Sequence, residues 1–306
     1  MSKLLNQGQP FLVSNVGTLG LHRDQLRGLL REHQVRRCLH GVYVSTEVPD
    51  SRDLRIAALR LVVPPYGILY GCTAAWALTV DTFAPGQRFD LVPQCVVPHG
   101  MGRVKMVGVR CVEGYLPPGD VMDVGGLSAT VPVRTTVDLL RTLRRPYALA
   151  AGDGMAHAGL VTVGEVTGYL TRLKGFPGIV QARELAPMIE PLAESPGESW
   201  QRLRLIDAGF PRPRAQLLVC DHRGRVVARL DHGYPEVRAG AEYDGREFHE
   251  HDADRERDGE RRAYLCRVLG WRIEVAGQEE TLGRDDSFER VMGGYLGINP
   301  DLPRQW

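Results

Sequence analysis

The sequence predicts a multidomain α/β protein. With 306 residues, the chain is long enough for two or three domains that each bury a hydrophobic core. Segments with helical spacing alternate with short apolar segments bounded by Gly and Pro, so both helices and strands are expected. The changes in pattern place the domain boundaries at residues 1–48, 49–193 and 194–306.

Composition limits the class of protein. The formal net charge of +1 argues against a protein that coats nucleic acid along its whole surface, although it permits a local basic patch. The six cysteines are scattered without Cys-x-x-Cys spacing, which indicates reduced thiols in the cytosol. The sequence has neither an N-terminal signal pattern nor an apolar run of membrane length. We therefore expect a soluble cytoplasmic protein with no membrane partner.

The first 48 residues are expected to form two helices and a basic hairpin. Residues 11–16 and 22–32 have helical spacing, and residues 35–44 follow as a hairpin with arginines in its turn. This is the layout of a winged helix-turn-helix, in which a helix enters the major groove and the hairpin touches phosphate. The alternative is a small docking module whose basic residues are only solvated. The predicted DNA contacts are Arg27, Arg36 and Arg37.

Residues 49–193 are expected to form a mixed α/β domain. The stretch 88–132, punctuated by Gly and Pro, predicts a small mixed sheet. Arg134 and Asp138 lie one helical turn apart, so an ion pair is favoured over a catalytic role. The predicted helices cover residues 55–63, 73–78, 131–140, 147–158, 163–173 and 180–192.

The C-terminal third contains a hairpin rich in carboxylates. Residues 226–230 and 237–243 predict two strands, separated by turn residues near Pro235. Such a turn places Asp231 level with Glu242, which shares one face of its strand with Asp244. Gathered carboxylates repel one another unless a divalent cation lies between them, so we expect Mg²⁺ or Mn²⁺ here. Taken singly, Asp231 is better explained as a turn cap and Glu242 as a charge at a strand end, and only the whole set of carboxylates favours a metal site.

The elements around this hairpin extend the pattern. A helix at 198–207 and a strand at 215–220 precede it, and a long helix at 252–269 and a strand at 271–275 follow. The order is helix, three strands, helix, strand. This resembles the αβββαβ core of the PD-(D/E)XK superfamily of restriction-endonuclease-like proteins.

Short motifs resemble one branch of that superfamily, the Vsr-like (very-short-patch-repair) endonucleases. The motifs lie at residues 229–231, 242–245 with His249, 257–258 and 269–271. The resemblance implies that Asp231 binds metal, that Glu242 to Asp244 occupies the (D/E)XK position, and that Glu198 and His249 complete the site. The motif lysine is absent and Asp244 holds its place; Vsr-like proteins also lack that lysine. Arg255, Arg257 and Arg262 would grip phosphates, or would form an ordinary charged helix face.

The N-terminal and middle regions resemble a different family. The ending of the predicted hairpin, Gly41 to Val44, and the run of Arg134, Thr135, Asp138 and Leu139 resemble AbiEi-type antitoxins. Two functions follow from the two resemblances. The favoured one is a metal-dependent endodeoxyribonuclease, because the carboxylates are retained; the alternative is a non-catalytic, antitoxin-like transcriptional regulator that keeps the nuclease fold for binding. The expected partners are DNA and either a cognate toxin or a second copy of the chain.

Overall fold

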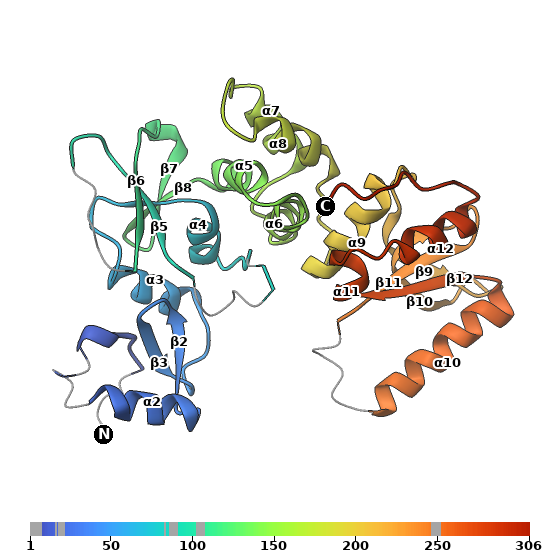
Figure 1. Ribbon diagram of the computed structural model, residues 1–306, viewed down its shortest axis with the longest axis horizontal. Coiled ribbons are helices and arrows are strands. Elements are labelled where there is room, and N and C mark those ends of the chain that lie inside the picture. Colours follow the sequence, from blue (N-terminus) through green and yellow to red (C-terminus); the bar gives the residue numbers. More distant parts are fainter. Residues whose placement is uncertain are drawn as a thin grey trace. The chain divides into compact units, whose positions relative to one another are not determined.

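The computed structural model (Figure 1) describes residues 8–15, 17, 22–82, 84–85, 91–101, 108–245 and 252–306, without the side chains of residues 23 and 252–258. The chain divides into two compact units. The first comprises Met1–Arg141 and Gly164–Pro177, and the second comprises Thr142–Val163 and Gly178–Trp306. Both units contain helices and sheets, which confirms the α/β class.

The first unit begins with a small antiparallel sheet and one helix. The sheet order is β1-β3-β2, and its elements are β1 Phe11–Leu12, β2 Val35–Leu39 and β3 Val42–Ser45. A 3-10 turn, η1 Val13–Asn15, and helix α2 Arg23–Arg31 lie between β1 and β2. The apolar side of α2 packs in a core made of Phe11, Leu26, Leu29, Val35 and Tyr43.

Two predictions for this region are wrong. Residues 11–15 do not form the predicted α-helix: Phe11 and Leu12 pair with β3 as a strand, and Val13–Asn15 form a 3-10 turn. The arginines are not in the hairpin turn either. The turn consists of His40 and Gly41, which has a φ of +76° that suits glycine. Because α2 is the one α-helix described before the hairpin, the winged helix-turn-helix stays a prediction.

The rest of the first unit is built around the predicted mixed sheet. Its five strands lie in the order β6-β5-β4-β8-β7, with β4 parallel to β8 and β5 parallel to β6. The strands are β4 Ile68–Leu69, β5 Gln94–Val97, β6 Arg110–Glu113, β7 Val121–Val124 and β8 Leu127–Thr130. The accompanying helices are α3 Arg52–Arg60, α4 Gly71–Ala77, η2 Pro118–Asp120, α5 Pro132–Thr142 and α7 Val163–Leu170.

The predicted pair on α5 is confirmed and belongs to a larger buried network. Nε of Arg134 lies 2.9 Å from Oδ2 of Asp138, and its Nη1 lies 3.1 Å from Oδ2 of Asp120. The Tyr169 hydroxyl on α7 donates to the same Asp120 oxygen at 2.6 Å. These groups are buried, so the network stabilises the packing of α5 and α7 and offers no reaction site.

The second unit contains the predicted series helix, three strands, helix, strand. These elements are α9 Pro196–Asp207, β9 Arg214–Cys220, β10 Val226–Tyr234, β11 Ala239–Asp244, α10 Asp252–Leu269 and β12 Arg272–Gly277. The sheet order is β12-β11-β10-β9; β9, β10 and β11 are antiparallel and β12 runs parallel to β11. Further helices are α6 Arg145–His157, α8 Ile179–Leu185, η3 Ala186–Met188, α11 Gln278–Leu282 and α12 Ser287–Leu296.

Helices cover this sheet on both sides, with α10 on the side away from α12 (Figure 1). Leu205 of α9 shares one apolar core with Phe288 and Met292 of α12. Leu265 of α10 belongs to a second core. Within the part of the chain that the structure describes, no helix combines the length and apolar character that crossing a bilayer requires.

Strand β10 is longer than the sequence predicts. Residues 232–234 were interpreted as turn residues but continue the strand, and the turn follows at residues 235–238. Position 233 in the strand requires glycine, because a Cβ there would be 2.2 Å from Cδ2 of Leu217. This glycine therefore marks a close approach between β10 and β9 and not a turn.

Candidate functional site

The hairpin of β10 and β11 brings Asp231 beside Glu242. Its register pairs His232 with Ala241, so Asp231 occupies the next position along β10, next to Glu242 on β11. The Tyr243 N–H donates a 2.8 Å hydrogen bond to Oδ2 of Asp231. This is the placement that a turn near Pro235 predicts.

Asp231 carries the most perturbed carboxyl of the hairpin. Burial, together with the nearby carboxylates of Glu198 and Glu242, raises the pKa of Asp231 to about 7 against the lowering effect of the Tyr243 N–H. Asp231 therefore exchanges a proton near neutral pH. Perturbed carboxyls of this kind are concentrated at functional sites, although structural clusters produce them too.

Glu198 reaches this cluster from the first turn of α9. Ser195 caps the helix by accepting the Glu198 N–H at 3.2 Å, and Pro196 occupies the first helical position. Oε2 of Glu198 accepts hydrogen bonds from the Glu194 N–H at 3.0 Å and from Nε2 of Gln216 at 2.8 Å. The carboxylate is thus buried but stabilised at a helix N-terminus.

A glycine fixes the distance between α9 and the hairpin. A Cβ on Gly197 would lie 2.0 Å from Cε1 of Tyr243, so a larger residue would push the helix off β11. On the same face, Nε2 of Gln201 donates to the Glu242 carbonyl at 3.1 Å. The start of α9 is therefore held against the end of β11, where the carboxylates meet.

Glu242 faces α10 and is neutralised there. Its Oε1 lies 3.0 Å from Nη2 of Arg261, and its Oε2 lies 4.0 Å from Nη1 of Arg262. Arg262 was a predicted phosphate contact, yet in this structure it lies against a carboxylate. Asp244, at the end of β11, is half-buried and paired in register with Gly277 of β12.

The carboxylates do not form a metal centre as they stand. Among the described residues, no three His, Cys, Asp or Glu side chains are arranged to hold a metal ion. The oxygens that would bind one already accept from Tyr243, Gln216 and Arg261. Beside this cluster, Oε1 of Gln216 is buried and accepts no hydrogen bond from the residues that the structure describes. The arrangement therefore fits proton exchange better than cation binding, and no metal-dependent step follows from it.

The other predicted residues of this site lie outside the described part of the chain. His249 is one of the undescribed residues 246–251. Arg255 and Arg257 belong to the backbone of α10, but their side chains are also outside the described residues. Their predicted roles stay predictions.

Sequence interpretation missed a buried histidine at this site. His232 is fully buried in β10, and its Nε2 lies 2.9 Å from the Glu198 carbonyl. Burial lowers the pKa of His232 to about 3, helped by the positive charge of Arg202. The ring is therefore neutral and structural. Its place in an apolar alternation with Leu230 and Tyr234 was the available signal, but Gly233 favoured a turn.

The predicted DNA contacts lie on β2 and α2. Nη2 of Arg36 donates to the Val48 carbonyl at 2.8 Å, and the Arg37 guanidinium lies 5.8 Å from the centre of the Tyr43 ring. Arg27 is highly exposed on α2 and pairs with Asp24 at 3.0 Å. Arg27 is therefore the most accessible of the three arginines.

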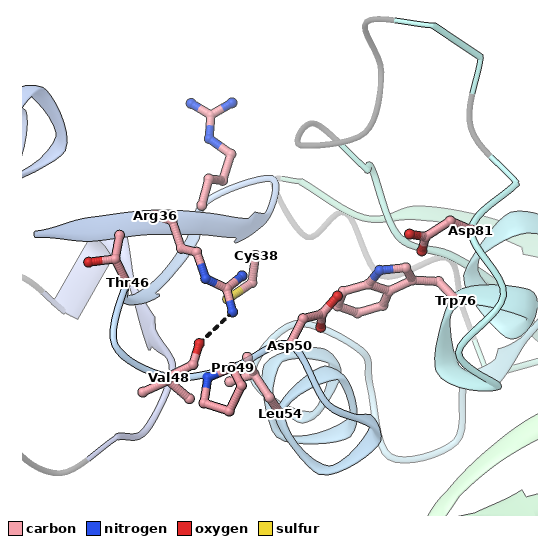
Figure 2. A pocket seen from close by; sticks show the side chains of 10 residues that line it. Arg36, Cys38, Thr46, Val48, Pro49, Asp50, Leu54, Trp76 and Asp81 are labelled. Atoms are coloured by element: carbon pink, nitrogen blue, oxygen red, sulfur yellow. Dashed lines mark hydrogen bonds between the residues drawn. The ribbon is translucent and has the colours of Figure 1, made fainter. Parts of the chain in front are cut away.

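Arg36 and Arg37 border a pocket of about 370 Å³ that also includes Asp50, Trp76 and Asp81 (Figure 2). Figure 2 shows Arg36 directed towards Val48, and Asp50 and Asp81 on either side of Trp76. The acidic residues are held by Arg55, which bonds Asp50 at 3.0 and 2.6 Å and Asp81 at 3.0 Å. The pocket therefore has a rigid, ion-paired wall and a basic rim.

Comparison with known proteins identifies similarity over most of the chain. Residues 67–188 match the model of the AbiEi antitoxin C-terminal domain. Two uncharacterized proteins of Mycobacterium tuberculosis, MT2308 (strain CDC 1551 / Oshkosh) and Rv2248 (strain ATCC 25618 / H37Rv), are each 32% identical over 259 residues, which covers 82% of this chain and 88% of theirs. The crystal structure of the RV2827C protein from Mycobacterium tuberculosis is similar at 13% identity and a TM-score of 0.31, covering 72% of this chain and 86% of that one.

The domain match confirms the predicted AbiEi-type resemblance of the middle region. It includes Arg134 and Asp138, which carried that prediction, together with the whole five-stranded sheet. The Vsr-like resemblance of the C-terminal third stays a prediction.

Proposed function

Because this chain belongs to the family of the Mycobacterium tuberculosis proteins MT2308 and Rv2248, and matches the AbiEi antitoxin C-terminal domain, we propose that it is an antitoxin-like regulator that binds DNA and a cognate toxin. The observation that carries this proposal is the domain match over residues 67–188. An antitoxin acts by binding, so this function requires no catalytic group.

The geometry of the first unit supports DNA binding next to that domain. Leu26 and Leu29 bury one face of α2, which leaves Arg27 and Arg31 exposed on the other. On the adjoining hairpin, Arg36 and Arg37 add two further cations. Guanidinium groups on one helix and an adjacent hairpin suit phosphate contacts on either side of a groove.

Selection from random duplexes with the full chain tests the DNA part. We expect an enriched sequence that binds at least about a thousandfold more tightly than a scrambled duplex at physiological salt. Arg27→Ala should weaken binding to both duplexes, whereas Arg229→Ala, an exposed arginine of the other unit, should not. Equal affinity for every duplex would contradict the proposal that the protein is a sequence-specific DNA-binding regulator.

The toxin part needs a separate experiment. Genes encoded beside this one are expressed alone and with the full chain, and growth is followed. We expect one neighbouring product to stop growth alone and to be neutralised by co-expression, and to co-purify with this chain. The absence of any toxic neighbour would remove the toxin partner from the proposal while leaving the DNA part to stand or fall on its own test.

A second candidate function is metal-dependent cleavage of DNA, which would require Mg²⁺ or Mn²⁺. The observation that favours it is the position of Asp231 between Glu198 and Glu242, within the same series of elements that the sequence predicts. The ion pair of Glu242 with Arg261 counts against it. Plasmid, linear and single-stranded DNA, each with Mg²⁺, Mn²⁺ or EDTA, test this function. Cleavage that requires a cation and disappears in folded Asp231→Ala and Glu242→Ala would establish it.

A further inference from the structure

Two thiols face each other in the five-stranded sheet. Cys95 on β5 pairs in register with Cys111 on the parallel strand β6. Their sulfur atoms are 3.3 Å apart, and either thiol can donate the hydrogen bond between them. An S–S bond is about 2.05 Å long, so a shift of roughly 1 Å would bring the two sulfurs to bonding distance.

The two thiols differ in their access to solvent. Strand β6 is at the edge of the sheet, and Cys111 on it is half-buried. Cys95 lies behind it on β5 and is fully buried. Burial, helped by the neighbouring Cys111 thiol, raises the pKa of Cys95 to about 12. A reagent from solvent therefore reaches Cys111 first, while Cys95 stays protonated and protected.

We propose that Cys95 and Cys111 form a reversible intramolecular disulfide when the protein meets hydrogen peroxide. The Cys111 thiolate sulfur attacks a peroxide oxygen, the O–O bond breaks, and the leaving oxygen takes up a proton, which gives water and a sulfenic acid on Cys111. The Cys95 sulfur then attacks the Cys111 sulfur, the S–O bond breaks, and the departing hydroxyl leaves as water with the Cys95 proton. The two thiols are oxidised, and hydrogen peroxide is reduced to two molecules of water.

The position of the pair explains why oxidation stops at a disulfide. A sulfenic acid is consumed fastest by a thiol that is already in contact with it, and Cys95 is 3.3 Å away. Among the described strands β6 lies at the edge and pairs with β5, so it can shift towards β5 more easily than an inner strand. The bond would tie β6 to β5 within the antitoxin-like segment. A thiol reductant would reverse it.

The other four cysteines provide internal controls. Cys38 and Cys72 lie on β2 and α4, where burial raises the pKa of Cys38 to about 11 and also raises that of Cys72. Neither should react quickly. Cys220 and Cys266 are exposed and should react with peroxide without forming the proposed bond.

The experiment treats the full chain with hydrogen peroxide, blocks remaining thiols in denaturant and maps peptides without reduction. We expect a peptide pair linking Cys95 to Cys111, lighter than the sum of the two reduced peptides by two hydrogen atoms, while Cys38 and Cys72 remain alkylated. Dithiothreitol should restore both thiols. Cys95→Ser should leave Cys111 to proceed to sulfinic acid, and Cys38→Ser should leave the linkage unchanged.

Two results would overturn the proposal. One is that Cys95 and Cys111 stay as thiols under conditions that oxidise Cys220 and Cys266. The other is that Cys111 reaches sulfinic acid in the wild type without any linked peptide. A far-ultraviolet circular dichroism spectrum of each serine variant confirms that a lost linkage is not the result of unfolding.

Discussion

The Tyr243 N–H donates a hydrogen bond of 2.8 Å to Oδ2 of Asp231, at the point where β10 and β11 meet the start of α9. This bond favours the ionised carboxylate. Burial and the carboxylates of Glu198 and Glu242 favour the protonated form more strongly, which leaves the pKa of Asp231 at about 7. The Tyr243 N–H thus holds the Asp231 carboxyl in place, while burial and the neighbouring carboxylates favour its protonated form.

The raised pKa of Asp231 predicts that the charge on this carboxyl destabilises the folded protein above neutral pH. An unfolded aspartate has a pKa of about 3.9, so the stabilisation gained from protonating Asp231 is fully present below about pH 4. It is lost as the pH rises through about 7, the folded-state pKa. Asp231→Asn removes the titration, so its free energy of unfolding relative to wild type should rise by roughly 2–3 kcal/mol from pH 5 to pH 8.

Urea unfolding of both proteins at the two pH values measures this difference. Asp244→Asn, which removes a carboxylate near the end of the same hairpin, is the matched control for the loss of a negative charge. If the difference in free energy of unfolding between Asp231→Asn and wild type is the same at pH 5 and pH 8, Asp231 does not titrate in this range.

The ion pair between Glu242 and Arg261 makes a second prediction. Glu242 is buried, so removing Arg261 takes away a 3.0 Å ion pair at a place with little water. Arg261→Ala should lower the free energy of unfolding by about 1–3 kcal/mol. Arg262→Ala, whose guanidinium is 4.0 Å from the same carboxylate, should cost less. The free energies of unfolding are compared by urea unfolding. Equal losses in the two variants would show that the 3.0 Å contact stabilises the protein no more than the 4.0 Å contact.

The hairpin shows what a sequence pattern can predict. The turn residues near Pro235 and the alternation on either side were enough to place Asp231 beside Glu242, because register follows from turn position and a period of two. The partners of these carboxylates could not be predicted in the same way. Arg261 reaches Glu242 from a helix whose rotation depends on packing at Leu265, and Gln216 reaches Glu198 on α9 from strand β9.

Local pattern failed where packing decided the conformation. Phe11 and Leu12 have helical neighbours in sequence but pair with β3, which buries Phe11 in the core of the small sheet. Gly233 reads as a turn residue, yet the close approach of Leu217 requires a glycine within the strand. In both cases the competing interaction comes from a segment distant in sequence, which a local pattern does not contain.

The response to divalent cations separates the two candidate functions. A ligand that binds only the folded state stabilises it by about 1.4 kcal/mol at tenfold excess over its Kd. Because Arg261 already neutralises Glu242, and no described group of three ligands is present, we expect millimolar Mg²⁺ or Mn²⁺ to leave the Tm unchanged. A rise in Tm that disappears in Asp231→Asn would contradict this expectation and favour the nuclease.

The last prediction concerns the salt dependence of DNA binding. Each phosphate contact that a protein makes releases counterions, so log K decreases with log salt. Each contact removed makes this negative slope shallower by about one unit. Arg36→Ala with Arg37→Ala should therefore flatten the slope by roughly two units and weaken binding to all sequences alike.

The bond of Arg36 to the Val48 carbonyl leaves other guanidinium N–H groups for a phosphate, because that contact uses Nη2 alone. Arg229→Ala is the control for general charge, since it removes an exposed arginine from the other unit. If the double variant and Arg229→Ala give the same slope as wild type, strand β2 does not contact the DNA backbone, and α2 with Arg27 becomes the part of the first unit to test.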